Sequence, residues 1–207
     1  MRKHYEQYCP VAHALDLVGE RWALLVVREL MQGPMRYTDL AEHLAGIGTN
    51  ILASRLRDLE ACGIVSKRTL PPPAASRVYE LTDYGLGLRP VIRELALWGA
   101  RSLGPPTAED ELFPGWLQNA LDTVLSLFAP PGRFEFRVAE EIASLVDGEA
   151  LPGSVDEPDV VVTGDPQGIF HLLVDRRLDL VSVEGDRALL DRLLDAAPPP
   201  VELQVPA

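Results

Sequence analysis

Gly104-Pro105-Pro106, in the middle of this 207-residue chain, limits its fold more than any other feature. A proline ring removes a backbone N–H donor and blocks the preceding helical turn, so tandem prolines after a glycine end a helix. A helical spacing of apolar residues stops at Leu103, and a second one begins at Leu112. We therefore expect two domains, residues 1–103 and 112–207, joined by a linker at 104–111.

The charge of the chain is divided at the same place. Residues 1–103 contain 13 Lys and Arg against 11 Asp and Glu, a net charge of +2, whereas residues 104–207 contain 6 against 20, a net charge of −14. The formal net charge of −12 therefore comes from the second domain. A nearly neutral first domain binds a polyanion when its basic groups lie on one surface, so the total charge does not exclude DNA binding.

The remaining totals indicate a globular protein of the cytoplasm. Apolar residues make up 47% of the chain, yet the apolar run 22–27 is far too short to span a membrane. Residues 1–10 are charged and lack the apolar segment of a signal peptide. Cys9 and Cys62 do not make a disulfide framework, which fits a reducing compartment. Four scattered histidines without ligand spacing predict no metal site, and we expect no cofactor.

The first domain is predicted to contain a helix-turn-helix. Two helices are expected within residues 10–31, and a short helix follows at 36–44, with Thr38 as its expected N-cap. The glycine-containing turn 45–48 then leads to a further helix, which Thr49 is expected to cap. Two helices joined by a turn of this length form a helix-turn-helix.

The helix that begins at Thr49 has an apolar and a polar face. Leu52, Leu56 and Leu59 recur at helical spacing and form the expected buried stripe. The opposite face carries small and polar side chains that suit the major groove, where Asn bonds adenine and Arg bonds guanine or phosphate. On an ordinary helix such a face is merely solvated, and the helix alone does not decide between the two interpretations. The residues of this face are Asn50, Ala53, Ser54 and Arg57.

A β-hairpin is predicted directly after this helix. The runs 64–70 and 76–82 are rich in β-branched and aromatic residues, and the proline-rich loop 71–75 joins them. A hairpin that follows a recognition helix is the wing of a winged helix-turn-helix, and its basic side chains are expected to meet phosphates. The hairpin therefore favours DNA binding. The predicted DNA-binding residues are Arg36, Tyr37, Thr49, Asn50, Ala53, Ser54, Arg57, Lys67, Arg68 and Arg77.

Several short motifs occur together in the first domain: Cys9-Pro10, Gly19 to Trp22, Arg28-Glu29-Leu30, Gly33-Pro34, Leu56-Arg57-Leu59-Glu60 and Tyr79-Leu81-Thr82-Gly85. With these motifs, residues 5–103 resemble the HxlR-type family of bacterial transcription regulators. The resemblance implies a homodimer, in which helices at about 12–18 and 86–102 form the dimer contact. Two recognition helices would then meet successive major grooves of a palindromic operator. Members often place proline and a basic residue just after the cap, where this chain has Asn50 and Ile51, so the operator sequence is not carried over.

The same resemblance draws attention to Cys9. In some members of the family, the cysteine at this position senses oxidants or electrophiles. The other interpretation, which we prefer, is that Cys9 is a small apolar residue at the start of a helix. A redox switch through Cys9 therefore remains an alternative mode of control.

The second domain is predicted to be α+β, with helices on one face of a mostly antiparallel sheet. A helix is expected at 112–128, followed by strands in 133–138 and 140–149. In the first of these strands, Phe134 and Phe136 are expected to point inward and Glu135 outward. Further strands are expected at 159–166, 178–186 and 201–205, with helices at 167–175 and 187–197.

Two segments of this domain, DVVVTGDPQGIFHLLVDRR and LDLVSVEGDRALLDRLL, resemble the sterol-carrier-protein fold. The resemblance implies an apolar tunnel between sheet and helices that holds a lipid-like molecule. Each candidate lining residue is also consistent with an ordinary core. The candidates are Trp116, Leu121, Leu125, Phe128, Phe134, Phe136, Ile169, Phe170, Leu173 and Leu190.

The chain contains no GxSxG, no glycine-rich phosphate loop and no HExxH, so we expect no enzyme. We hypothesise a DNA-binding transcription regulator, acting as a homodimeric repressor on a palindromic operator and controlled by a hydrophobic small molecule in the second domain. The alternatives are the redox switch through Cys9 and a lipid-binding protein that no longer binds DNA.

Overall fold

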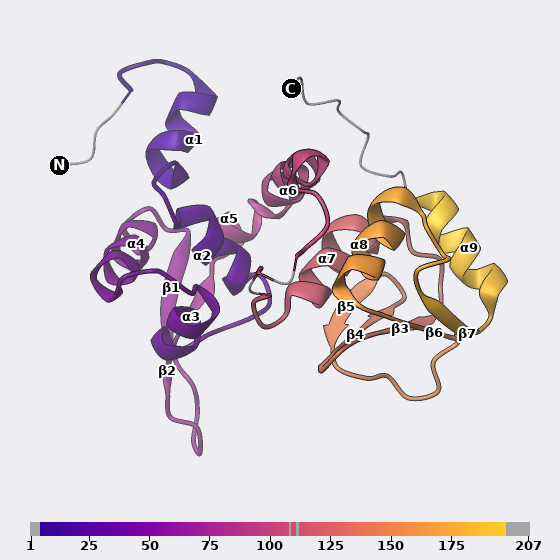
Figure 1. The fold of residues 1–207 in the computed structure, drawn as a ribbon. Coiled ribbons are helices and arrows are strands. Elements are labelled where there is room, and N and C mark those ends of the chain that lie inside the picture. Colours follow the sequence, from indigo (N-terminus) through magenta and orange to yellow (C-terminus); the bar gives the residue numbers. More distant parts are fainter. Residues whose placement is uncertain (1–4, 108, 111, 198–207) are drawn as a thin grey trace. The chain divides into compact units, whose positions relative to one another are not determined.

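The computed structural model describes residues 5–107, 109–110 and 112–197 (Figure 1). The chain divides into two compact units, the first ending at Arg93 and the second beginning at Glu94. This division falls inside helix α6 (Arg89–Leu103), whose Ile92 packs against the core of the first unit and whose Leu97 packs against the core of the second. The linker at 104–111 stays a prediction.

The first unit begins with four helices. They are α1 (Pro10–Val18), α2 (Ala23–Leu30), α3 (Tyr37–His43) and α4 (Thr49–Ala61). Strands β1 (Val65–Thr69) and β2 (Arg77–Leu81) follow, and the short helix α5 (Asp83–Leu86) leads into α6. The order of these elements confirms the predicted helix-turn-helix and the predicted hairpin.

Two predicted helix caps are wrong. Thr38 lies inside α3, where the carboxylate of Asp39 instead accepts a hydrogen bond from the Arg36 N–H at 3.1 Å. Helix α4 begins at Thr49 itself, and Gly48 takes the N-cap position without a side-chain bond. An N-cap residue needs an extended backbone. Arg36 and Gly48, with ψ angles of 163° and 142°, are the extended residues at these two places, so the chain enters each helix earlier than expected.

The core of the first unit lies where α4 packs on the other helices. The predicted stripe of Leu52, Leu56 and Leu59 is at most 1% exposed. These side chains share one apolar cluster with Val26 of α2 and Leu40 of α3. Because burial of a leucine contributes about 1.5–3 kcal/mol relative to exposure, the stripe alone fixes which face of α4 is turned inward.

The hairpin is fixed to the body of the first unit along β2. Strands β1 and β2 are antiparallel, with Val65 opposite Leu81 and Thr69 opposite Arg77. On the other edge of β2, Tyr79 and Met35 exchange two backbone hydrogen bonds of 2.8 and 3.0 Å. The base of the wing is therefore held by a third segment, while the connection at 70–76 extends from it (Figure 1).

The second unit covers one face of a five-stranded sheet with three helices (Figure 1). The strand order is β5-β4-β3-β6-β7, with β3 and β6 parallel and all other pairs antiparallel, which confirms the predicted mostly antiparallel sheet. The elements are α7 (Trp116–Val124), the 3-10 turn η1 (Ser126–Phe128), β3 (Arg133–Val138), β4 (Glu141–Val146), β5 (Glu149–Pro152), β6 (Val160–Gly164), α8 (Pro166–Asp175), β7 (Ser182–Gly185) and α9 (Arg187–Ala196).

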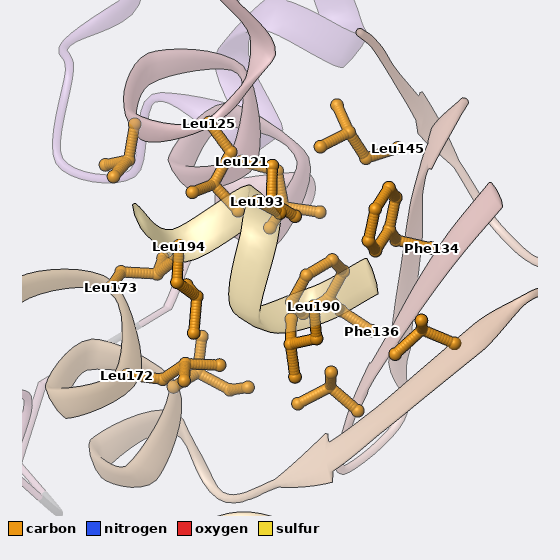
Figure 2. Packing of buried hydrophobic residues seen from close by; sticks show 14 of the residues in the cluster. Leu121, Leu125, Phe134, Phe136, Leu145, Leu172, Leu173, Leu190, Leu193 and Leu194 are labelled. Atoms are coloured by element: carbon orange, nitrogen blue, oxygen red, sulfur yellow. The ribbon is translucent and has the colours of Figure 1, made fainter. Parts of the chain in front are cut away.

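Figure 2 shows the apolar core of this unit, between β3 and the helices. Phe134 and Phe136 are fully buried and point inward, as predicted, toward leucines such as Leu190 of α9. Glu135 lies between them in β3 and is also buried, at 1% exposure. Its carboxylate accepts a hydrogen bond from the Val155 N–H at 3.0 Å, because the loop between β5 and β6 covers the second face of the sheet at this point.

Three element predictions for the second unit differ from the structure. The helix expected at 112–128 begins only after Gly115, whose φ of 81° is left-handed, and it ends at Val124. Strand β5 is separated from β4 by a turn at Asp147 and Gly148, both with positive φ, where one continuous strand was expected. Strand β7 is shorter than expected, and the strand expected at 201–205 lies outside the described residues. Within the described part of the chain, no helix combines the length and hydropathy needed to cross a bilayer.

Candidate nucleic-acid interface

The side of α4 opposite its leucines carries the residues predicted to read DNA. Asn50 and Arg57 are exposed, whereas Ala53 and Ser54 are half-buried. Arg57 has no ion-pair partner among the residues that the structure describes. This face therefore presents an amide, a hydroxyl and a guanidinium over a small side chain, a set able to approach base edges closely.

The first turn of α4 is held in place from α3. The hydroxyl of Tyr37 donates a hydrogen bond to the carbonyl oxygen of Thr49 at 2.7 Å. Tyr37 belongs to the predicted DNA-binding set, but its hydroxyl proton is used inside the protein. Its evident role in the structure is to position α4, while Arg36 and Thr38 beside it are exposed.

A buried carboxylate ties α3 to α2. The side chain of Glu29 is fully buried and accepts a hydrogen bond from Arg28 Nε at 2.8 Å. Nδ1 of His43, at the end of α3, lies 3.0 Å from the second carboxylate oxygen. A buried charge is tolerated when it is paired and hydrogen-bonded, so this cluster fixes the first helix of the helix-turn-helix.

Arg55 connects α4 to the turn between α1 and α2. Its guanidinium lies 3.0 Å from the Asp58 carboxylate and 3.6 Å from that of Glu20. Only 17% of the side chain is exposed, since Arg55 lies at the edge of the leucine stripe. Arg55 therefore holds α4 in place and leaves Arg57 as the exposed arginine of the helix.

Three of the residues predicted to contact phosphates lie on the wing, and two of them form ion pairs with carboxylates. Nζ of Lys67 lies 2.5 Å from Glu60, and Nε of Arg68 lies 2.9 Å from Glu80. Arg77 is exposed and has no ion-pair partner in the described part of the chain. Of the three cationic side chains of the wing, Arg77 is thus the one without a carboxylate partner in the described residues.

The fold brings the predicted DNA-binding residues to three consecutive elements: the start of α3, the polar face of α4 and the hairpin. The two carboxylates that pair with the wing were not predicted from the sequence. Glu60 follows Arg57 by three residues on α4, and Glu80 lies diagonally across the hairpin from Arg68. Cross-strand spacing contained a signal for Glu80, whereas the contact of Glu60 with Lys67 depends on how α4 packs beside β1.

Both cysteines are free thiols. Cys9 is half-buried and directly precedes α1, whereas Cys62 directly follows α4 and packs against the core of the first unit. In the regions the structure describes, no cluster of three or more His, Cys, Asp or Glu residues is arranged to hold a metal ion.

The residues predicted to line a ligand tunnel lie in the second unit, and most of them belong to its core cluster. Phe170 packs edge-on against the ring of His171, with centroids 5.6 Å apart. Trp116 and Phe128 pack against the edge of the cluster and are partly buried. The remaining candidates lie within it, at no more than 4% exposure: Leu121, Leu125, Phe134, Phe136, Ile169, Leu173 and Leu190.

Known proteins resemble the first half of the chain. Residues 17–106 match the model of the HxlR-like helix-turn-helix family. The HTH-type transcriptional regulator YodB of Bacillus subtilis is 35% identical over 98 residues, which cover 47% of this chain and 88% of that protein. An uncharacterised HTH-type transcriptional regulator of Mycobacterium tuberculosis, MT3179, is 40% identical over 100 residues, covering 46% of this chain and 63% of its own.

Among solved structures, the reduced form of YodB from B. subtilis aligns with a TM-score of 0.42 at 33% identity, covering 49% of this chain and all of that one. The family match ends at residue 106 and so does not describe residues 107–207, most of the second unit. With YodB aligned over most of its length, the chain belongs to the HxlR-like helix-turn-helix family and is a transcription regulator, not an enzyme.

Proposed function

We propose that this regulator binds duplex DNA through α4 and the wing. The observation that carries the proposal is the exposed polar face of α4, with Asn50 and Arg57 opposite the buried leucines. A helix of this kind reads base edges in the major groove, and the hairpin beside it meets phosphates. The contact residues are those predicted from the sequence, with Tyr37 acting mainly through its bond to Thr49.

The regulator acts as a homodimer. Helix α6 supports this part of the proposal, because Val91, Leu95 and Trp98 recur at helical spacing and are 52%, 47% and 63% exposed. On α1, Val11 and Leu15 are likewise exposed. Apolar stripes of this kind mark surfaces that another protein chain covers, and a second copy provides the same stripe by two-fold symmetry.

A two-fold dimer matches a palindromic operator whose half-sites lie about 34 Å apart along the duplex. We propose that binding there represses transcription in the cytoplasm, by covering DNA that the polymerase needs. The acidic second unit, with its repulsion of phosphates, stays clear of the duplex.

Replacement of Arg57 by alanine tests the proposed reading face. We expect Arg57→Ala to weaken binding to a duplex selected from fragmented genomic DNA by about 1–3 kcal/mol, because the guanidinium contacts a base or a phosphate there. Fluorescence anisotropy with the labelled duplex measures the change. The matched control is Arg192→Ala, which removes an exposed arginine from α9. Equal affinities of both variants and the parent protein would remove Arg57 from the interface.

The proposed effector is a hydrophobic small molecule bound between the sheet and helices of the second unit. The support for it is the single apolar cluster that joins α7, α8 and α9 to the sheet. Ligand changes DNA affinity only if it binds the competent and incompetent arrangements differently. Native mass spectrometry of freshly purified protein is expected to show a bound apolar compound, whose extraction alters DNA affinity. Protein that carries no such compound and is unaffected by extraction would remove the effector from the proposal.

A redox switch is the second candidate mode of control, and the half-buried free thiol of Cys9 before α1 supports it. If Cys9 is the switch, an oxidant such as diamide abolishes DNA binding by the parent protein but not by Cys9→Ser. If the effector alone controls the protein, both proteins keep their DNA affinity after oxidation.

A parent protein that fails to retard DNA even at low salt would favour the other alternative, a lipid-binding protein that no longer binds DNA.

A further inference from the structure

Lys67 and Arg68 differ from the other basic residues of the interface in having carboxylate partners. Nζ of Lys67 lies 2.5 Å from Glu60 and also lies over the ring of Tyr79, 5.5 Å from its centroid. Nε of Arg68 lies 3.1 and 2.9 Å from the two carboxylate oxygens of Glu80. Lys67 and Arg68, which are proposed to contact phosphates, are thus paired with carboxylates of the same unit.

The two carboxylates lie beside the proposed DNA surface. Glu60 follows Ala53 by seven residues and Arg57 by three, so it lies on the same side of α4 as the base-reading residues. Its bond to Lys67 spans the space between α4 and β1. Glu80 occupies β2, two residue pairs closer to the hairpin base than Val78, which faces Arg68.

Fold stability does not account for these pairs. The side chains of Lys67 and Glu60 are 33% and 38% exposed, and those of Arg68 and Glu80 are 46% and 28% exposed. Ion pairs with this much solvent contact contribute little to folding. Near a phosphate, however, each carboxylate repels the DNA and competes for the cation at the same time.

We propose that Glu60 and Glu80 are specificity-determining residues, which restrain Lys67 and Arg68 and thereby lower the affinity for DNA of arbitrary sequence. The inference rests on the proposed DNA-binding function. Residues 5–93 contain ten Lys and Arg and ten Asp and Glu, so this unit has little net attraction for DNA, and two more free cations would change it appreciably. Sequence-independent affinity comes from phosphate contacts, and a regulator finds its operator only if that affinity stays low. Base contacts made by α4 then determine the DNA sequence at which the protein remains bound.

The test uses the full chain and a 30-base-pair duplex of random sequence, titrated by fluorescence anisotropy at several salt concentrations. For Glu60→Gln/Glu80→Gln we expect affinity about threefold to tenfold higher at low salt, and a slope of log K against log salt steeper by about 0.9 per released cation. The control Glu140→Gln/Glu184→Gln removes the same charge from exposed positions of the second unit. This control should leave affinity and slope nearly unchanged.

A second pair of substitutions tests whether the gain in random-duplex affinity comes from Lys67 and Arg68. Lys67→Ala/Arg68→Ala should lower random-duplex affinity less in the parent protein than in the Glu60→Gln/Glu80→Gln background, where it should remove the whole gain. An equal gain in the control, or an equal loss in both backgrounds, overturns the inference while DNA binding stands. If the parent protein binds no duplex at low salt, the proposed function fails as well.

Discussion

A chain in which Leu95 and Trp98 are both replaced by aspartate is expected to be monomeric. Within the described chain, none of the 15 residues of α6 is buried, and Val91, Leu95 and Trp98 form one exposed apolar stripe. In the proposed dimer, a second copy covers this stripe. Two carboxylates placed there would lose their hydration without gaining partners, which a dimer interface does not tolerate. Sedimentation velocity measures the change in mass.

The loss of the dimer should reduce operator affinity far more than any single contact does. Linking two half-site contacts raises the overall affinity about 10²–10⁴-fold, so a monomer loses a factor of this size. The control Ala96→Asp/Ala188→Asp adds the same charge at exposed positions outside the stripe and should remain dimeric with full affinity. If Leu95→Asp/Trp98→Asp also remains dimeric, α6 is not the dimer contact.

Phe136→Ala is expected to have the largest effect on stability. The ring is fully buried in the central strand β3 and packs within the cluster that joins the sheet to all three helices (Figure 2). Its removal loses the transfer free energy of the ring and leaves a cavity, together about 3–5 kcal/mol. Urea denaturation followed by circular dichroism measures the loss as an earlier unfolding transition of the second unit.

Phe170→Ala serves as the control for that experiment. Phe170 is half-buried in the same unit and packs edge-on against His171, so its removal should cost much less than that of Phe136. If both variants unfold at the same urea concentration as the parent protein, the cluster around β3 does not hold this unit together.

Periodic features of the sequence predicted most of the fold. The helical spacing of Leu52, Leu56 and Leu59 correctly predicted which face of α4 is buried. The alternation of Phe134 and Phe136 correctly identified β3. Both signals are local, because the spacing of apolar residues along a helix or strand determines which face is buried. The family resemblance of the first half rested on motifs that are likewise contiguous in the sequence.

Features that depend on backbone conformation or on distant contacts were not predictable in this way. The caps of α3 and α4 depend on which residue is extended, and Thr38 and Thr49 have the right chemistry at the wrong positions. Glu135 has the polar character of an outward strand residue, but a distant loop covers it. The carboxylate partners of Lys67 and Arg68 were not predicted either, since they lie seven and twelve residues away on other elements of the fold.

Photocrosslinking from Ser54 shows whether the polar face of α4 touches DNA. Ser54 lies in the middle of that face and is half-buried, so a photoreactive residue placed there would contact only what lies against the helix. With a selected genomic duplex, we expect a crosslink to DNA from position 54 and none from position 192 on α9. Crosslinks to DNA from position 192 but not from position 54 would contradict this expectation.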